Sequence, residues 1–179
     1  MSRKVRNIFR RRTTSAAADV LPTNLVATIG DASVALSWSG SSNATSYYVK
    51  RSLTSGGGYT AIATNVSLAF TNAGLSNGTL YYYVVSALNG AGESTNSAQV
   101  SARPMSFAPT QLGIAATGNQ LQLNWPHDHT GWQLQAQTNS LAVGLNTNWN
   151  TIAGSTETNQ ITLPVDATNG AVFFRLMRP

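Results

Sequence analysis

The residues best suited to chemistry lie in one short run, His127-Asp128-His129, which places two imidazoles two positions apart with a carboxylate between them. On a β-strand, residues i and i+2 share a face, so two such histidines could begin a metal site. A protein zinc site needs three or four ligands, and this run follows Trp125-Pro126 in a predicted loop. We therefore interpret the run as a polar turn and keep its three residues only as a weak metal candidate.

Five aromatic side chains are candidates for contact with a glycan or a partner protein: Tyr48, Tyr59, Tyr82, Trp132 and Trp149. Tyr48 and Tyr82 each alternate with tyrosines that are expected to face the core, so both should point outward. Exposed rings beside Asn and Gln suit a glycan, because a ring covers the apolar face of a sugar while amides bind its hydroxyls. Ordinary cross-strand pairing of aromatic side chains is the alternative interpretation.

A basic arm opens the chain and holds six of its 11 Lys and Arg residues: Arg3, Lys4, Arg6, Arg10, Arg11 and Arg12. From residue 13 onward five basic residues face six acidic ones, so the net charge of +5 and the pI of about 10 describe the arm alone. Clustered arginines can bind nucleic acid or another anionic surface. The spacing of Val5, Ile8 and Phe9 also fits an amphipathic helix that binds a membrane or a partner. As further alternatives, the arm is a solvated tail or the first part of an export signal.

Catalytic and cofactor-binding patterns are missing from the sequence. The six carboxylates are scattered without a close pair, and no serine nucleophile elbow or phosphate-binding glycine loop is present. The chain has no cysteine, which excludes disulfides, thiolate metal sites and cysteine catalysis. We therefore predict a protein that is not an enzyme and has no cofactor.

The composition also bears on location. Only 9% of the residues are charged, against roughly 25% in an average soluble domain, and a neutral polar surface suits extracellular or assembled proteins. No stretch of about 18 apolar residues could span a membrane. The segment after Arg12 is too polar for the core of a cleaved signal peptide, so export by that route is not expected.

The elements that must position these residues are short β-strands. After an arm at 1–20, residues 21–104 alternate apolar and polar positions in short segments separated by turns, beginning with a Gly30-Asp31 hairpin turn. A long alternating run is predicted over 79–88, and no window keeps a helical period. About seven strands in this length predict an antiparallel β-sandwich, hence an all-β fold.

A repeat predicts a second sandwich. Val34-Ala-Leu-Ser-Trp38 returns 87 positions later as Leu121-Gln-Leu-Asn-Trp125, after a linker at 105–108. The second unit, 109–179, is shorter, and no strand is predicted after 172–176. Its sheet is therefore expected to lack the final edge strand, and an open edge would be covered by the linker, the first domain or another chain.

Residues 21–104 resemble a fibronectin type III domain. The resemblance rests on Pro22-x-x-Leu25, Leu36-Ser-Trp38, Tyr47-x-Val49, Leu75-x-x-Gly78-x-x-Tyr81-x-Tyr83-x-Val85 and Asn89-x-x-Gly92-Glu93-Ser94. It implies that Trp38 is the buried core tryptophan and that the Tyr81 hydroxyl returns to the backbone near Leu75 as a tyrosine corner. By the repeat, Trp125 is expected to be the core tryptophan of the second unit.

Residues 109–179 are similar to a short C-terminal β-sandwich module of large secreted bacterial proteins, on Gly131-Trp-x-Leu-Gln and Val172-Phe-Phe-Arg-Leu176. Both resemblances imply spacers, adhesion units or accessory binding units without catalytic residues. We expect the protein to be a non-catalytic structural or binding module of a bacterial extracellular, cell-surface or virion assembly. It would act through contacts with protein subunits or polysaccharide. Alternatives are a virion or filament subunit using the arm and open sheet edges, and an accessory fragment of a secreted carbohydrate-active enzyme. Nucleic acid or an anionic surface would be bound only through the arm.

Overall fold

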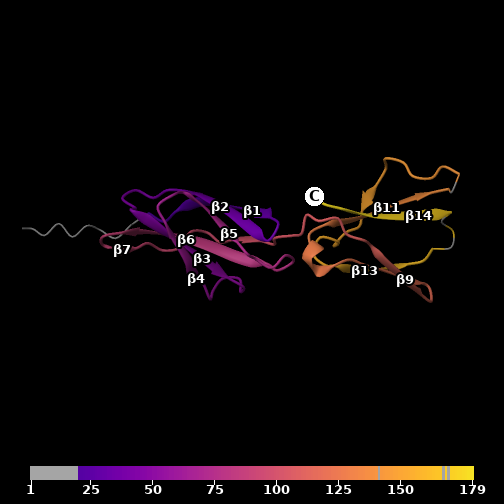
Figure 1. Ribbon diagram of the computed structural model, residues 1–179, viewed down its shortest axis with the longest axis horizontal. Coiled ribbons are helices and arrows are strands. Elements are labelled where there is room, and N and C mark those ends of the chain that lie inside the picture. Colours follow the sequence, from indigo (N-terminus) through magenta and orange to yellow (C-terminus); the bar gives the residue numbers. More distant parts are fainter. Residues whose placement is uncertain (1–19, 141, 167, 169) are drawn as a thin grey trace, which may run out of the picture.

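The computed structural model describes residues 20–140, 142–166, 168 and 170–179, so the basic arm at 1–19 lies outside the described residues. Among these described residues the regular elements are β-strands apart from one 3-10 turn, η1 (His127–His129), which confirms the all-β fold class. Figure 1 shows two groups of strands arranged end to end, β1 to β8 in one and β9 to β14 in the other. No helix among the described residues is long and apolar enough to cross a membrane.

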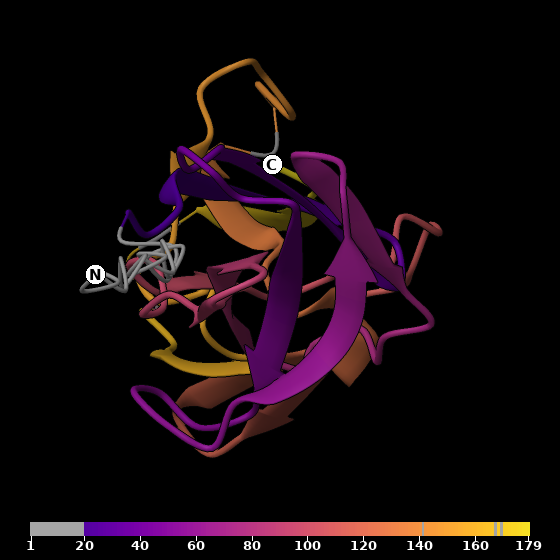
Figure 2. The ribbon, with the colours of Figure 1, turned by 90° about the vertical axis from the view of Figure 1, so that its left-hand side faces the viewer.

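The first group is a sandwich of two antiparallel sheets. One sheet has the order β1-β2-β5, from β1 (Thr23–Gly30), β2 (Ser33–Ser39) and β5 (Ala69–Ala73). The other has the order β4-β3-β6-β7, with β8 also pairing β6, from β4 (Thr60–Asn65), β3 (Ser46–Ser52), β6 (Tyr81–Asn89), β7 (Gly92–Glu93) and β8 (Val100–Ala102). Figure 2 views this sandwich from the end that faces away from the second group.

The core of the first sandwich follows the predicted alternation. Trp38 is buried, with its ring edge against Tyr47 at 5.7 Å between ring centroids. Tyr81 is buried too, and its hydroxyl oxygen accepts a hydrogen bond from the backbone N–H of Ser76 at 3.1 Å. The predicted tyrosine corner is therefore confirmed, and it fixes the approach to β6.

The second group repeats this topology in smaller form. One sheet has the order β9-β10-β13, from β9 (Gly113–Thr117), β10 (Gln120–Asn124) and β13 (Gln160–Pro164). The other has the order β12-β11-β14, from β12 (Asn150–Thr151), β11 (Gln133–Asn139) and β14 (Ala171–Met177). Its core cluster has three buried residues, Leu123, Trp125 and Leu134. Within the described residues no strand corresponds to β7 and β8.

The two tryptophans of the repeat have equivalent surroundings. Trp38 donates its backbone N–H to the carbonyl of Leu68 at 3.0 Å, and Trp125 donates its own to the carbonyl of Asn159 at 3.0 Å. Both indole Nε1 atoms are buried without a hydrogen-bond partner among the described residues. This shared geometry indicates one fold type used twice.

One predicted turn is displaced. The sequence predicts a hairpin turn at Gly30-Asp31, whereas β1 extends through Gly30 and the turn falls on Asp31 and Ala32. Ala32 adopts a φ of 46°, and its N–H donates to Asn77 Oδ1 at 2.8 Å. A contact 45 residues away in the chain thus offsets the strain that a non-glycine residue has in this left-handed region.

Candidate functional site

The linker between the sandwiches is bonded into both of them. On the side of the first sandwich, the Gly78 N–H donates to the Pro104 carbonyl at 2.8 Å and the Met105 N–H to the Gly30 carbonyl at 3.3 Å. On the other side, the Ser106 N–H donates to the Asp128 carbonyl at 2.7 Å. Met105 and Ser106 are also buried. A linker whose backbone is hydrogen-bonded in both directions has little freedom to bend.

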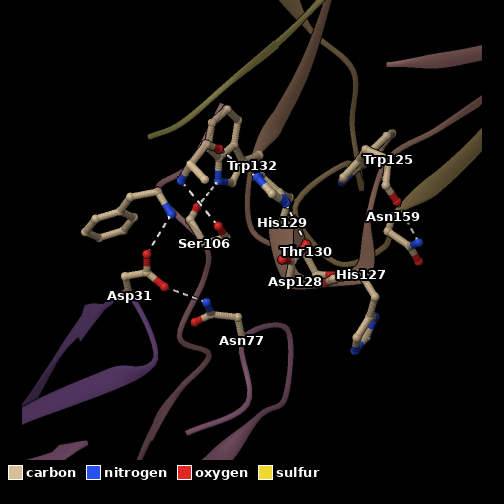
Figure 3. A network of polar contacts seen from close by, with 12 residues as sticks. Asp31, Asn77, Ser106, Trp125, His127, Asp128, His129, Thr130, Trp132 and Asn159 are labelled. Atoms are coloured by element: carbon tan, nitrogen blue, oxygen red, sulfur yellow. Dashed lines mark hydrogen bonds and ion pairs between the residues drawn. The ribbon is translucent and has the colours of Figure 1, made fainter. Parts of the chain in front are cut away.

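His129 anchors the second sandwich to this linker (Figure 3). Its side chain is buried, with Nδ1 2.7 Å from Asp128 Oδ1 and Nε2 2.8 Å from the Ala108 carbonyl oxygen. The ring packs edge-on against Trp132, whose Nε1 donates to the Ser106 carbonyl at 3.0 Å. The His129 imidazole and the Trp132 indole therefore bind two carbonyls of the linker, those of Ala108 and Ser106.

The His127-Asp128-His129 run, which the sequence favours as a polar turn and keeps only as a weak metal candidate, forms a turn in the structure. The run is a 3-10 turn rather than a strand, so His127 and His129 do not share a face, and both ring nitrogens of His129 are occupied. The described part of the chain contains no group of three or more His, Cys, Asp or Glu residues placed to hold a metal ion. The role of the run is to position the linker.

A direct contact between the sandwiches lies beside the linker. Gly78 has a φ of +80°, and a Cβ atom built there would lie 2.3 Å from the His127 carbonyl oxygen. Asp31 bridges the same region, since Oδ1 accepts from Asn77 Nδ2 at 2.6 Å and Oδ2 from the Phe107 N–H at 3.4 Å (Figure 3). The close approach at Gly78 thus requires a residue without a side chain.

Arg103 forms a second bridge between the sandwiches. Its guanidinium donates to the Thr156 carbonyl at 3.4 Å and lies 3.5 Å from a Glu157 carboxylate oxygen. A cavity of about 430 Å³ lies beside it, walled in part by Ile29 and Met105. Sequence reasoning named Gly78 only as part of a family motif and did not identify Arg103 or Ser106, because the junction contacts of all three are with residues far away in the chain.

Two of the five predicted contact aromatics lie on an outer sheet face. Tyr48 on β3 and Tyr82 on β6 are half-buried, and each alternates with buried neighbours on the core side. Between them on this face lies Lys50, which forms an ion pair with Glu93. Hydrogen bonds from Lys50 and then from Ser86 lower the pKa of the Glu93 carboxyl. The face therefore carries the rings of Tyr48 and Tyr82 beside the Lys50–Glu93 ion pair, which has no net charge.

The other three aromatics are engaged within the protein. The Tyr59 hydroxyl donates to Gln99 Oε1. The guanidinium carbon of Arg175 lies over the Trp149 ring, 4.3 Å from the ring centroid. Trp132 is only 9% exposed and holds the linker, so its predicted role in surface contact is wrong. Trp38, Tyr81 and Trp125 lie in the cores, as predicted.

Comparison with known proteins identifies one part of the chain. The fibronectin type III domain model matches residues 21–103. An Fn3-like protein from Clostridium thermocellum is 41% identical, covering 51% of this chain and 99% of that one, with a TM-score of 0.46. A segment of a β-1,2-glucanase from Parabacteroides distasonis is 25% identical over 54% of this chain and 14% of the glucanase, with a TM-score of 0.46.

A third similar structure spans both sandwiches. Domains FN1–FN3 of chicken CNTN1 are 12% identical over 90% of this chain and 68% of that chain, with a TM-score of 0.42. No curated protein matches the chain.

Proposed function

The chain belongs to the fibronectin type III family through residues 21–103, and on that premise we propose that it is a non-catalytic structural and binding module. In this role it holds two sandwiches in one relative orientation within an extracellular, cell-surface or virion assembly. The observation that supports this proposal is the linker, whose backbone is hydrogen-bonded to both sandwiches. A spacer that transmits position needs a fixed junction, whereas a freely jointed pair would need no buried linker.

The proposed contact surface is the outer face that carries Tyr48 and Tyr82. Both rings are partly exposed, and Lys50 and Glu93 neutralise each other between them. A face of rings and polar groups without net charge suits a polysaccharide or a neutral protein surface better than a strongly charged partner. The aromatic side chains would supply most of the binding energy.

The fixed junction is tested by substituting alanine for Gly78, with Gly74→Ala as the matched control. Both glycines have a positive φ, +80° and +69°, but a Cβ atom at Gly74 would meet nothing within 4 Å. Both variants therefore carry similar backbone strain, and only Gly78→Ala collides with His127. Because the sandwiches lie end to end, a loosened junction allows bent and more compact arrangements (Figure 1). Small-angle X-ray scattering should therefore show a smaller radius of gyration for Gly78→Ala alone. Identical scattering from the two variants would mean that this contact does not fix the sandwiches.

The contact surface is tested on a glycan array. If the wild-type chain binds a glycan, the double variant Tyr48→Ala and Tyr82→Ala should bind it at least roughly tenfold more weakly, because two ring contacts are lost. Val66→Ala is the control, since Val66 is 79% exposed and lies in the loop between β4 and β5. Absence of glycan binding by the wild type would refute the polysaccharide part of the proposal and leave the junction result standing.

A further inference from the structure

The second sandwich leaves part of its inner face uncovered. Ile114 on β9 pairs with Leu123 on β10, so the two side chains point to the same face. Leu123 is 0% exposed, whereas Ile114 is 57% exposed. An inward-facing isoleucine with this exposure lacks the layer that should lie over it.

The opposite sheet shows the same deficiency on β14. Leu176 pairs with Leu134, which is fully buried, so Leu176 faces inward, and by alternation Phe174 and Val172 do too. Val172 is nevertheless 40% exposed. A cavity of about 670 Å³ lies between the sheets, and Leu121, Leu163 and Phe174 are among the residues that line it. The interior is therefore open along β9 and β14.

The first sandwich shows what normally closes this side. There β6 occupies the position of β14, and β7 and β8 pair with it antiparallel. Between them, the N–H groups of Ser94 and Ser97 donate to the carbonyls of Ala87 and Val85 at 2.9 and 2.8 Å. Ala87 and Val85 belong to the core cluster and are 0% exposed beside this segment. Among the described residues β14 pairs only with β11, so the uncovered side is the place of one antiparallel strand.

The structure assigns this open side as a two-fold interface, in which β14 of a second copy of this chain supplies the missing strand. The strand required must run antiparallel to β14 and present apolar side chains at alternate positions. The residues Val172, Phe174 and Leu176 of β14 itself have this pattern. A two-fold axis perpendicular to the sheet makes the paired strands antiparallel and keeps both inner faces on the same side. Each copy would then cover the Ile114 region of the other.

The edge of β14 is unprotected against such pairing. Proline, lysine and bulges commonly block edge-to-edge association, and β14 has no proline or lysine and no bulge in its register with β11. Its one charged residue, Arg175, lies on the outer face, where it donates to Gln135 Oε1 at 2.8 Å and covers the Trp149 ring. Residues 109–179 carry two basic and three acidic residues, a net charge of −1, so repulsion between copies is weak. This inference goes beyond the proposed function and does not depend on it.

The first test is the oligomeric state of the full chain, measured by size-exclusion chromatography with light scattering over a wide concentration range. We expect a dimer for the wild type. Val172→Lys and Ile114→Lys should each give a folded monomer by circular dichroism, because both positions are already partly exposed and only the dimer would bury the charge. Val26→Lys, at a 54% exposed position on β1, should leave the dimer intact.

Several results would overturn the interface. A wild type that stays monomeric at its highest soluble concentration would do so, as would a dimer that survives both lysine substitutions. A dimer lost on removal of residues 1–19 but retained in Val172→Lys would assign the association to the basic arm instead.

The second test determines the geometry of pairing. The chain has no cysteine, so any disulfide must come from an introduced residue. Single cysteines at Ala171, Phe173, Arg175 and Met177 sample the outer face of β14. Antiparallel self-pairing brings a position next to its own copy only at the two-fold axis. If the axis passes through an outer residue, that single cysteine alone should form the disulfide dimer. If it passes through Phe174, the dimer should form only in a mixture of the Phe173→Cys and Arg175→Cys chains, which then lie opposite each other. Equal cross-linking at all four positions, or no cross-linking in any single or mixed sample, would contradict the assigned pairing.

Discussion

At the scale of single residues, the first sandwich stabilises a neutral tyrosine inside its core. Tyr83 is fully buried, and its hydroxyl donates to Asn72 Oδ1 at 3.1 Å. Burial raises the pKa of Tyr83 from 10.0 to about 12, with Arg51 partly opposing the shift. The folded state therefore keeps a proton that the unfolded chain releases.

This shift predicts a loss of stability at high pH. Between about pH 10 and pH 12 the unfolded state binds fewer protons than the native state, so the free energy of unfolding should fall as the pH rises. The contribution of one proton is at most about 1.4 kcal/mol per pH unit. Denaturant unfolding of the wild type and of Tyr83→Phe across this range measures it. The substitution removes the titrating group, so the wild type should show the steeper decline, and equal slopes would exclude Tyr83 as the cause.

At the scale of elements, the two sandwiches differ in how much of their apolar surface they bury. The core of the first contains 12 buried residues, whereas that of the second contains three, surrounded by partly buried side chains. Since burial of apolar area is the main stabilising contribution, the second sandwich should be the weaker unit as a monomer.

Amide hydrogen exchange should reveal this difference. We expect the amides of β10 and β11 to exchange faster than those of β3 and β6 in a monomeric variant such as Val172→Lys, because opening the second core exposes less apolar surface. In a wild-type dimer, β14 should gain protection. Equal protection of the four central strands would show that the small core is not the weaker one.

The elements were largely predictable from the sequence, but their junction was not. Alternation and the Trp38 and Trp125 repeat predicted the two sandwiches, because strand period and core position are local properties of a sequence. Trp132 alternates with the core residue Leu134, and this spacing favours burial of the Trp132 side chain. Its indole, however, donates to the carbonyl of Ser106, which lies 26 residues away in the chain. Asn77-Gly78 had the sequence of an ordinary turn. The contact of Gly78 with residue 127 comes from tertiary packing, for which a single sequence carries no local signal.

At the scale of the whole molecule, positive charge is concentrated at the start of the sequence. Residues 1–12 contain six basic residues and no acidic one, while the remainder has a net charge of −1. Binding to a polyanion should therefore depend on the arm and weaken steeply with salt. On a heparin column, the full chain should be retained and a chain starting at residue 13 should not be. Retention of the shortened chain would show that the sandwiches contain a basic surface of their own.

The contact between Gly78 and the carbonyl of residue 127 also affects how this pair of domains could be inherited or re-engineered. Domains joined by a flexible linker can be exchanged independently, because neither domain depends on the sequence of its neighbour. Here the turn before β6 of one domain lies against the backbone of the other, and the linker is hydrogen-bonded to both domains. Moving either domain to a new neighbour would leave an exposed indentation at Gly78 and an unpaired linker. We therefore expect the two domains to be transferred to a new protein more readily as a pair than singly.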